Sequence, residues 1–161
     1  MIRRKVLVLS MLVTSLGALA ACGTPTAAPG ASGGAGSIAP GDKPEEAFEE
    51  GGNLEVPASM VAEALDQGMP LVFLDARDKL NYEAGHIPGA INVPFFDVDK
   101  HLDSVPKDKW LIAYCACPTA EAKQLADQLL NKGYTKVKVI QEGLDGWTGM
   151  GRELEKGTPA P

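Results

Sequence analysis

Apolar segments of two different periods alternate along most of the chain, and this alternation restricts the fold more than any other feature. Segments 57–67 and 119–134 place apolar residues on one helical face, at spacings of three and four. Segments 70–77, 109–115 and 136–141 are short apolar runs, which are typical of strands buried in a parallel sheet. The sequence therefore predicts an α/β fold, a three-layer α/β/α sandwich with a mainly parallel central sheet.

Weaker patterns complete the predicted domain, which extends from residue 53 to 161. Residues 90–93 form a short strand pattern after a Gly/Pro turn, residues 97–105 a short helix, and residues 143–151 a final turn or short helix. Trp110 and Trp147 are expected in the core, since large aromatic side chains bury most of their surface.

The N-terminus has the organisation of an export signal. Basic residues at positions 3–5 precede an apolar run over 6–19, which is short for a membrane-spanning helix. The end of this segment, "LAAC" at 19–22, resembles the lipobox of bacterial lipoproteins. The resemblance implies a signal peptide over 1–21, cleavage before a lipidated Cys22, and a membrane lipoprotein on the extracytoplasmic face. A plain secretory signal with an incidental cysteine is the alternative.

Residues 22–52 are rich in Gly, Pro, Ala and Ser and contain few residues that could fill a core. We interpret this segment as a flexible tether between the lipidated cysteine and the domain. The formal net charge of −6 argues against nucleic acid as a partner and against binding to anionic lipid. Membrane attachment is therefore expected through the acyl chains alone.

A strand followed by a Cys-x-Cys-Pro turn and a helix forms the leading candidate for a site. Ligands of parallel α/β sheets bind beyond the carboxyl ends of the strands, and Cys115 lies at such an end. Backbone N–H groups at the N-terminus of a helix favour negative charge, so we expect a thiolate with a lowered pKa at this position. A small buried residue of no catalytic role is the alternative.

Four motifs, "LDAR", "GHIPGAINVP", "YCACP" and "GLDGWTGMG", occur in the order and spacing of a single rhodanese domain over about Val56 to Arg152. The chain resembles this family. The resemblance implies a sulfurtransferase or persulfide carrier, in which Cys115 accepts a sulfane sulfur as a persulfide and passes it to an acceptor thiol. It also implies a structural role for Asp75 and Arg77 as an ion pair, and for His86 as a turn residue bonded to backbone.

The loop after Cys115 departs from the pattern of the family that the chain resembles, in which a basic residue commonly helps to bind anions. This loop has no basic residue, and Glu121 follows it directly. Thiosulfate should therefore be a poor donor, and a neutral or protein-bound persulfide a better one. The loop residues are Ala116, Cys117, Pro118, Thr119 and Ala120.

The sequence is compatible with other roles of the cysteine pair. Cys117 could resolve the persulfide or close a disulfide with Cys115, which would make the chain a thiol redox protein. Alternatively, Cys117 could be a loop residue that caps the following helix. The domain could instead be a catalytically silent binding module. No metal site is expected, because His86 and His101 give no spacing that completes one with the cysteines. No cofactor is expected, and the expected partners are a sulfur donor, an acceptor thiol and the membrane.

Overall fold

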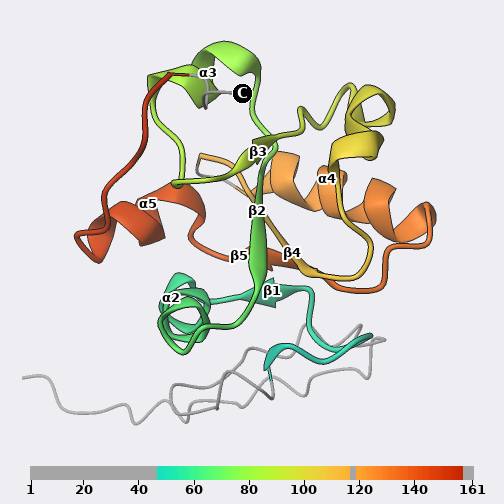
Figure 1. Ribbon diagram of the computed structural model, residues 1–161, viewed down its shortest axis with the longest axis horizontal. Coiled ribbons are helices and arrows are strands. Elements are labelled where there is room, and N and C mark those ends of the chain that lie inside the picture. The colour runs from blue at the N-terminus through green and yellow to red at the C-terminus, as the bar shows by residue number, and fades with distance from the viewer. Residues whose placement is uncertain (1–46, 117–118, 158–161) are drawn as a thin grey trace, which may run out of the picture. The chain divides into compact units, whose positions relative to one another are not determined.

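The computed structural model describes residues 47–116 and 119–157 (Figure 1). Its centre is a sheet of five strands in the order β1-β5-β4-β2-β3, with every neighbouring pair parallel. The strands are β1 (Glu55–Val56), β2 (Leu71–Asp75), β3 (Ile91–Asn92), β4 (Trp110–Tyr114) and β5 (Val137–Ile140). The helices are α2 (Ala58–Asp66), α3 (Lys79–Ala84), α4 (Ala120–Asn131), α5 (Gly143–Gly149) and the 3-10 helix η1 (Val98–Ser104). The predicted α/β architecture is confirmed.

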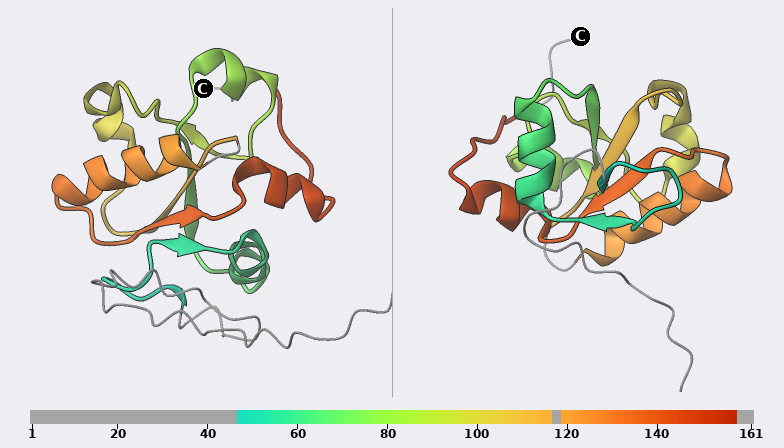
Figure 2. Two further views of the ribbon diagram at one scale, coloured as in Figure 1. Left: turned by 180° about the vertical axis from the view of Figure 1, so that it is seen from behind. Right: turned by 90° about the horizontal axis from the view of Figure 1, so that it is seen from below.

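Helices cover both faces of this sheet, as Figures 1 and 2 show: α4 lies on one side, and α2 and α5 lie on the other. The side chains of β4 alternate between the two resulting apolar clusters, as the two-residue period of a strand requires. The alternation continues into Cys115, which directly follows β4 and belongs to the α4 cluster. The strand pattern thereby decides that the thiol lies on the α4 side of the sheet.

Helix α3 was not predicted from the sequence. It has only six residues, too short for its apolar period to be recognised. Its N-terminus is capped by Asp78, whose side chain accepts a hydrogen bond from Asn81 N at 3.0 Å. Such a cap was the one local signal that could have revealed the helix.

The segment before β1 packs onto the domain, whereas the sequence analysis assigned residues up to 52 to a tether. Ala47 and Phe48 are buried in the cluster on the α2 side. The ring of Phe48 meets that of Trp110 edge to face, with centroids 5.4 Å apart. The contact of Phe48 with Trp110 helps to hold this segment, and the packed region begins before residue 53.

Lys138 connects this segment to the middle of the sheet. The residue lies in β5 and is only 1% exposed. Its Nζ donates hydrogen bonds to the carbonyl oxygens of Glu49, at 3.0 Å, and Asn53, at 2.7 Å, and lies 5.4 Å from the centroid of the Trp110 ring. Burial lowers the pKa of Lys138, although the charge of Glu49 opposes this effect. A buried ammonium therefore depends on two main-chain carbonyls of the preceding segment.

Replacing Lys138 with methionine should release this segment from the domain. Hydrogen bonds that involve a charged group contribute more than neutral ones, so amide hydrogen exchange over residues 48–53 should become at least roughly tenfold faster. Hydrogen exchange followed by mass spectrometry measures the change, with the exposed Lys109→Met as a control. Equal protection in both variants would show that the lysine does not hold the segment.

The predicted signal peptide and Cys22 lie outside the described residues, as does the tether up to residue 46. Within residues 47–116 and 119–157, none of the helices is long and apolar enough to span a membrane. The lipoprotein signal and the membrane location stay predictions.

Candidate functional site

The backbone of Cys115 is held from two sides at the carboxyl end of β4. Its carbonyl accepts a hydrogen bond from Leu144 N at 2.9 Å, and the carbonyl of the preceding Tyr114 accepts one from Ala76 N at 2.9 Å. The residue is 0% exposed. The structure thus places the predicted nucleophile at the end of a central strand, with its thiol on the side of α4.

The electrostatics of this thiol differ from the sequence-based expectation. Burial raises the pKa of Cys115, and the negative charge of Glu121 adds to this effect. Backbone hydrogen bonds from Ala122 and Glu121 act in the opposite direction and lower the pKa. The expected cradle of N–H groups in the first turn of α4 is present, but desolvation outweighs it. The prediction of a lowered pKa is therefore wrong for this conformation.

The raised pKa has a measurable consequence. With Cys22 and Cys117 replaced by serine, Cys115 is the last of the three cysteines. Its alkylation by iodoacetamide at neutral pH should be slower than that of glutathione, because less of the thiol is ionised and its access is restricted. The pH profile of the rate should have its midpoint above that of an ordinary cysteine. A midpoint below that of an ordinary cysteine would show that the backbone N–H groups of α4 affect the pKa of Cys115 more than burial does.

The loop is described only in part. Ala116 is exposed, Thr119 is the N-cap of α4 without a side-chain cap hydrogen bond, and Ala120 is the exposed first residue of the helix. Cys117 and Pro118 lie outside the described residues, so the role of the second cysteine stays open. Glu121 occupies the first turn of α4, as the sequence indicated.

Asp75 and Arg77 form a buried ion pair beside the site. Arg77 Nε donates to Asp75 Oδ1 at 2.9 Å, and Arg77 Nη2 donates to Asp75 Oδ2 at 2.5 Å and to the Gly85 carbonyl at 2.7 Å. Burial disfavours the charged guanidinium, but its hydrogen bond to Asp75 and the charge of that carboxylate raise the pKa of Arg77. The positive charge of Arg77 is therefore committed to Asp75 and is not a substitute for the basic residue missing from the loop.

His86 is fully buried and bonded to its own turn. Its Nδ1 donates to the carbonyl of Tyr82 at 2.9 Å, and its ring stacks on the Tyr82 ring with centroids 3.8 Å apart. Its Nε2 lies 3.7 Å from a carboxylate oxygen of Glu155. Nδ1 thus bonds the backbone of the turn, whereas Nε2 has no hydrogen-bond partner among the described residues.

Tyr114 connects the histidine turn to the strand that ends at Cys115. Its hydroxyl accepts a hydrogen bond from Ile87 N at 3.0 Å. Burial raises the pKa of Tyr114, and the nearby charge of Asp75 adds to this effect. The tyrosine is therefore a neutral link between the two segments at neutral pH.

Gly143 is a residue whose importance to the site was not recognised from the sequence. It has a positive φ of 59°, and a Cβ added there would lie 2.6 Å from the carbonyl oxygen of Cys115. The turn between β5 and α5 can approach the cysteine only because this position has no side chain. The "GLDGW" motif marked the glycine, but no local pattern reveals a contact between residues so far apart in the chain.

Among the described residues, no three His, Cys, Asp or Glu side chains are grouped in a way that could hold a metal ion. The chemistry offered by the described part of the site is that of a thiol with backbone hydrogen-bond donors.

Comparison with known proteins supports the same fold and family. A curated sulfurtransferase of Allochromatium vinosum is 24% identical over 97 residues, which are 60% of this chain and 90% of that protein. A curated HTH-type transcriptional regulator of Mycobacterium tuberculosis is 29% identical over 89 residues, which are 55% of this chain but only 39% of the regulator. This chain therefore spans about two fifths of that relative's length.

Solved structures of rhodanese-like domains have a similar fold. The solution structure of the rhodanese-like domain of an Anabaena sp. protein is 29% identical, with a TM-score of 0.59, and the match covers 68% of this chain and 86% of that one. The family model of the rhodanese-like domain matches residues 58–150, which include every strand except β1, together with Asp75, Arg77 and His86. The chain therefore belongs to the rhodanese-like domain family.

Proposed function

We propose that the chain is a sulfurtransferase or persulfide carrier in which Cys115 is the nucleophile. The observation that carries the proposal is the position of Cys115 at the carboxyl end of β4, with backbone hydrogen bonds from Glu121 and Ala122 in the first turn of α4. The same N–H groups would stabilise the negative charge of a thiolate or of a terminal persulfide sulfur. Relatives that are named as sulfurtransferases support the class of reaction.

The reaction needs no oxidant. The Cys115 thiolate attacks the outer sulfur of a donor persulfide, a bond forms between the two sulfurs, and the donor leaves as a thiolate that takes up a proton. An acceptor thiolate then attacks the outer sulfur of the Cys115 persulfide, and the Cys115 thiolate leaves. Each step forms one S–S bond and breaks another.

The charges near the site favour a donor that is not a small anion. Glu121 raises the pKa of Cys115 and would also repel thiosulfate, while the guanidinium of Arg77 is paired with Asp75. We therefore expect glutathione persulfide or a protein persulfide to react faster than thiosulfate. Because Cys115 is 0% exposed, neighbouring residues have to move before any donor can reach the thiol.

Mass spectrometry of the intact chain tests the proposal. Incubation with glutathione persulfide should add about 32 Da, the mass of one sulfur atom, and Cys115→Ser should abolish the added mass. Cys117→Ser is the matched control and should keep it. Thiosulfate should load the wild type more slowly at equal concentration. An added sulfur that persists in Cys115→Ser, or that never forms with either donor, would refute the assignment of Cys115.

One observation favours a catalytically silent binding module as a second candidate. The thiol is buried and its pKa is raised, which are properties of a cysteine that serves only to fill space. A related transcriptional regulator contains a matching segment as part of a larger protein. The loading experiment separates the two, because a silent module takes up no sulfur.

A further inference from the structure

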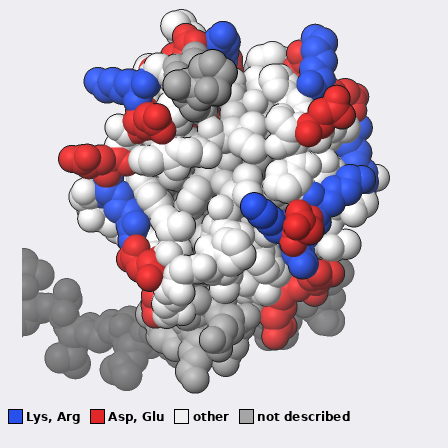
Figure 3. Space-filling view, in the orientation of Figure 1, with Lys and Arg blue, Asp and Glu red and all other residues white. Residues whose placement is uncertain are grey.

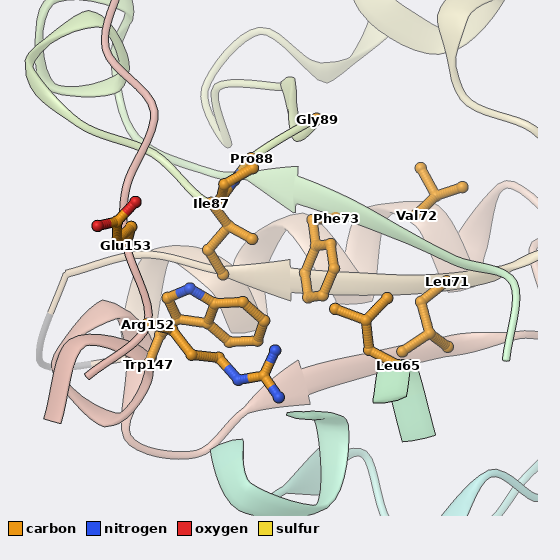
Figure 4. Close-up of a pocket in the computed structure, with 10 residues that line it drawn as sticks. All are labelled: Leu65, Leu71, Val72, Phe73, Ile87, Pro88, Gly89, Trp147, Arg152 and Glu153. Carbon is orange, nitrogen blue, oxygen red and sulfur yellow. The ribbon is translucent and has the colours of Figure 1, made fainter. Parts of the chain in front are cut away.

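A cavity lies on the face of the sheet opposite to that of the Cys115 thiol. It has a volume of about 480 Å³, within the range of roughly 300–1,000 Å³ that is typical of small-molecule sites. Much of its apolar wall is formed by Leu65 of α2, Phe73 of β2, Trp147 of α5 and, from the segment between α3 and β3, Ile87 (Figure 4). Cys115 is not among the residues that line it, so this pocket is separate from the site proposed for sulfur transfer.

Trp147 brings an unused hydrogen-bond donor to this wall. The residue is 3% exposed, and its Nε1 has no hydrogen-bond acceptor among the described residues. In Figure 4 the indole nitrogen lies on the edge of the ring that is turned toward Ile87 and Pro88, two residues that line the same pocket. Buried donors almost always have a partner, so an unpartnered indole N–H in a pocket wall indicates a place for an acceptor.

The rest of the indole is fixed by its neighbours. Its ring meets that of Phe73 edge to face, with centroids 5.3 Å apart, and the guanidinium of Arg152 lies 4.9 Å from its centroid on top of the ring. The donor is therefore held in one orientation. Because Nε1 itself is buried, a neighbouring side chain has to shift before an acceptor in the pocket can reach it.

The charges around the pocket favour a neutral ligand. Arg152 already forms an ion pair with Asp66, and the other charged residue of the wall is the exposed Glu153. An anionic ligand would have to compete with Asp66 for the guanidinium and would be repelled by Glu153. Figure 3 shows a broad uncharged area across the face that is seen in Figure 1, where β2 lies in front.

We propose that this pocket binds a small neutral molecule with a mainly apolar body and one oxygen acceptor, which accepts a hydrogen bond from Trp147 Nε1. The apolar body would lie against Leu65, Leu71 and Phe73, and the acceptor would lie near Ile87. Cys115 does not line this pocket, so the proposal of a ligand site here and the proposal of sulfur transfer can be refuted independently.

Three probes of similar shape test this proposal: acetophenone, ethylbenzene, which lacks the oxygen, and benzoate, which is anionic. The full-length chain with 15N-labelled tryptophan gives one indole signal for Trp147 and one for Trp110, which serves as the internal reference. Acetophenone should move the Trp147 indole proton downfield in a saturable way, should leave Trp110 unchanged, and should bind more tightly than either other probe. The same titration of Cys115→Ser should give the same result.

Trp147→Phe is the matched variant, because it keeps an aromatic ring and removes the part of the indole that carries the N–H donor. Its affinity for acetophenone should fall roughly three- to tenfold, as for the loss of one neutral hydrogen bond, while that for ethylbenzene stays nearly unchanged. Backbone amide shifts of Phe73 and Ile87 report binding in this variant and confirm that it is folded. Equal binding of acetophenone and ethylbenzene, tighter binding of benzoate, or a Trp147 signal that no probe moves would each overturn the proposal.

Discussion

Asp75→Ala is expected to lower the free energy of unfolding by about 3–5 kcal/mol, the usual cost of removing one partner of a buried ion pair. Asp75 is 0% exposed and accepts hydrogen bonds from the backbone N and the guanidinium of Arg77. Without it, the guanidinium stays buried with only the carbonyl of Gly85 as an acceptor among the bonds described above. Urea denaturation followed by circular dichroism measures the loss.

The double variant Asp75→Leu with Arg77→Met is the control for this experiment. It removes both charges together, so it should be clearly more stable than Asp75→Ala. The half-buried Asp78→Ala, three residues further along, removes only the cap of α3 and should have a smaller effect. If Asp75→Ala lowered the free energy of unfolding by less than about 1 kcal/mol, the ion pair of Asp75 and Arg77 would not be important for stability.

Gly143→Ala should damage both stability and the geometry of the site. The new Cβ would lie 2.6 Å from the carbonyl oxygen of Cys115, in backbone that has a positive φ. A left-handed residue with a Cβ costs about 1–2 kcal/mol, and the contact with a main-chain oxygen adds to this cost. We expect a loss of at least about 2 kcal/mol and sulfur loading of Cys115 at least roughly tenfold slower, because the end of β4 has to shift.

Gly149→Ala is the matched control for that change. Gly149 is the last residue of the same helix, has no positive φ, and has nothing within 4 Å of an added Cβ. Alanine there should be neutral or slightly stabilising, since it reduces the freedom of the unfolded chain. If both variants unfolded at the same urea concentration, the close approach of Gly143 to Cys115 would have no energetic weight.

The sequence predicted the parts of this fold that repeat locally. The apolar runs of β2, β4 and β5 and the helical period of α4 gave the α/β class, because burial on two faces leaves its mark on each strand. The predicted ends differ from the observed ones by one to three residues. The order of the strands in the sheet has no such local mark, and it was not predicted.

At the site, the sequence placed the cysteine but not its surroundings. Cys115 could be found because a strand end, a turn and a helix follow one another in the chain. The direction of its pKa shift could not be predicted, because burial by residues distant in the chain raises the pKa more than the helix N-terminus lowers it. The contact of Gly143 with Cys115 and the two acceptors of Lys138 were missed for the same reason: each joins residues far apart in the sequence.

The position of Phe48 has a practical consequence for any shortened version of the protein. A chain trimmed to start at Leu54, where the strand and helix pattern begins, would lack the ring that covers Trp110 and both carbonyls that accept from Lys138. In such a fragment, the ammonium of Lys138 would lose both of these hydrogen-bond acceptors, and the indole of Trp110 would be exposed to water. Loss of activity or solubility in such a fragment would then report the missing seven residues from Ala47 to Asn53, and not the chemistry of Cys115.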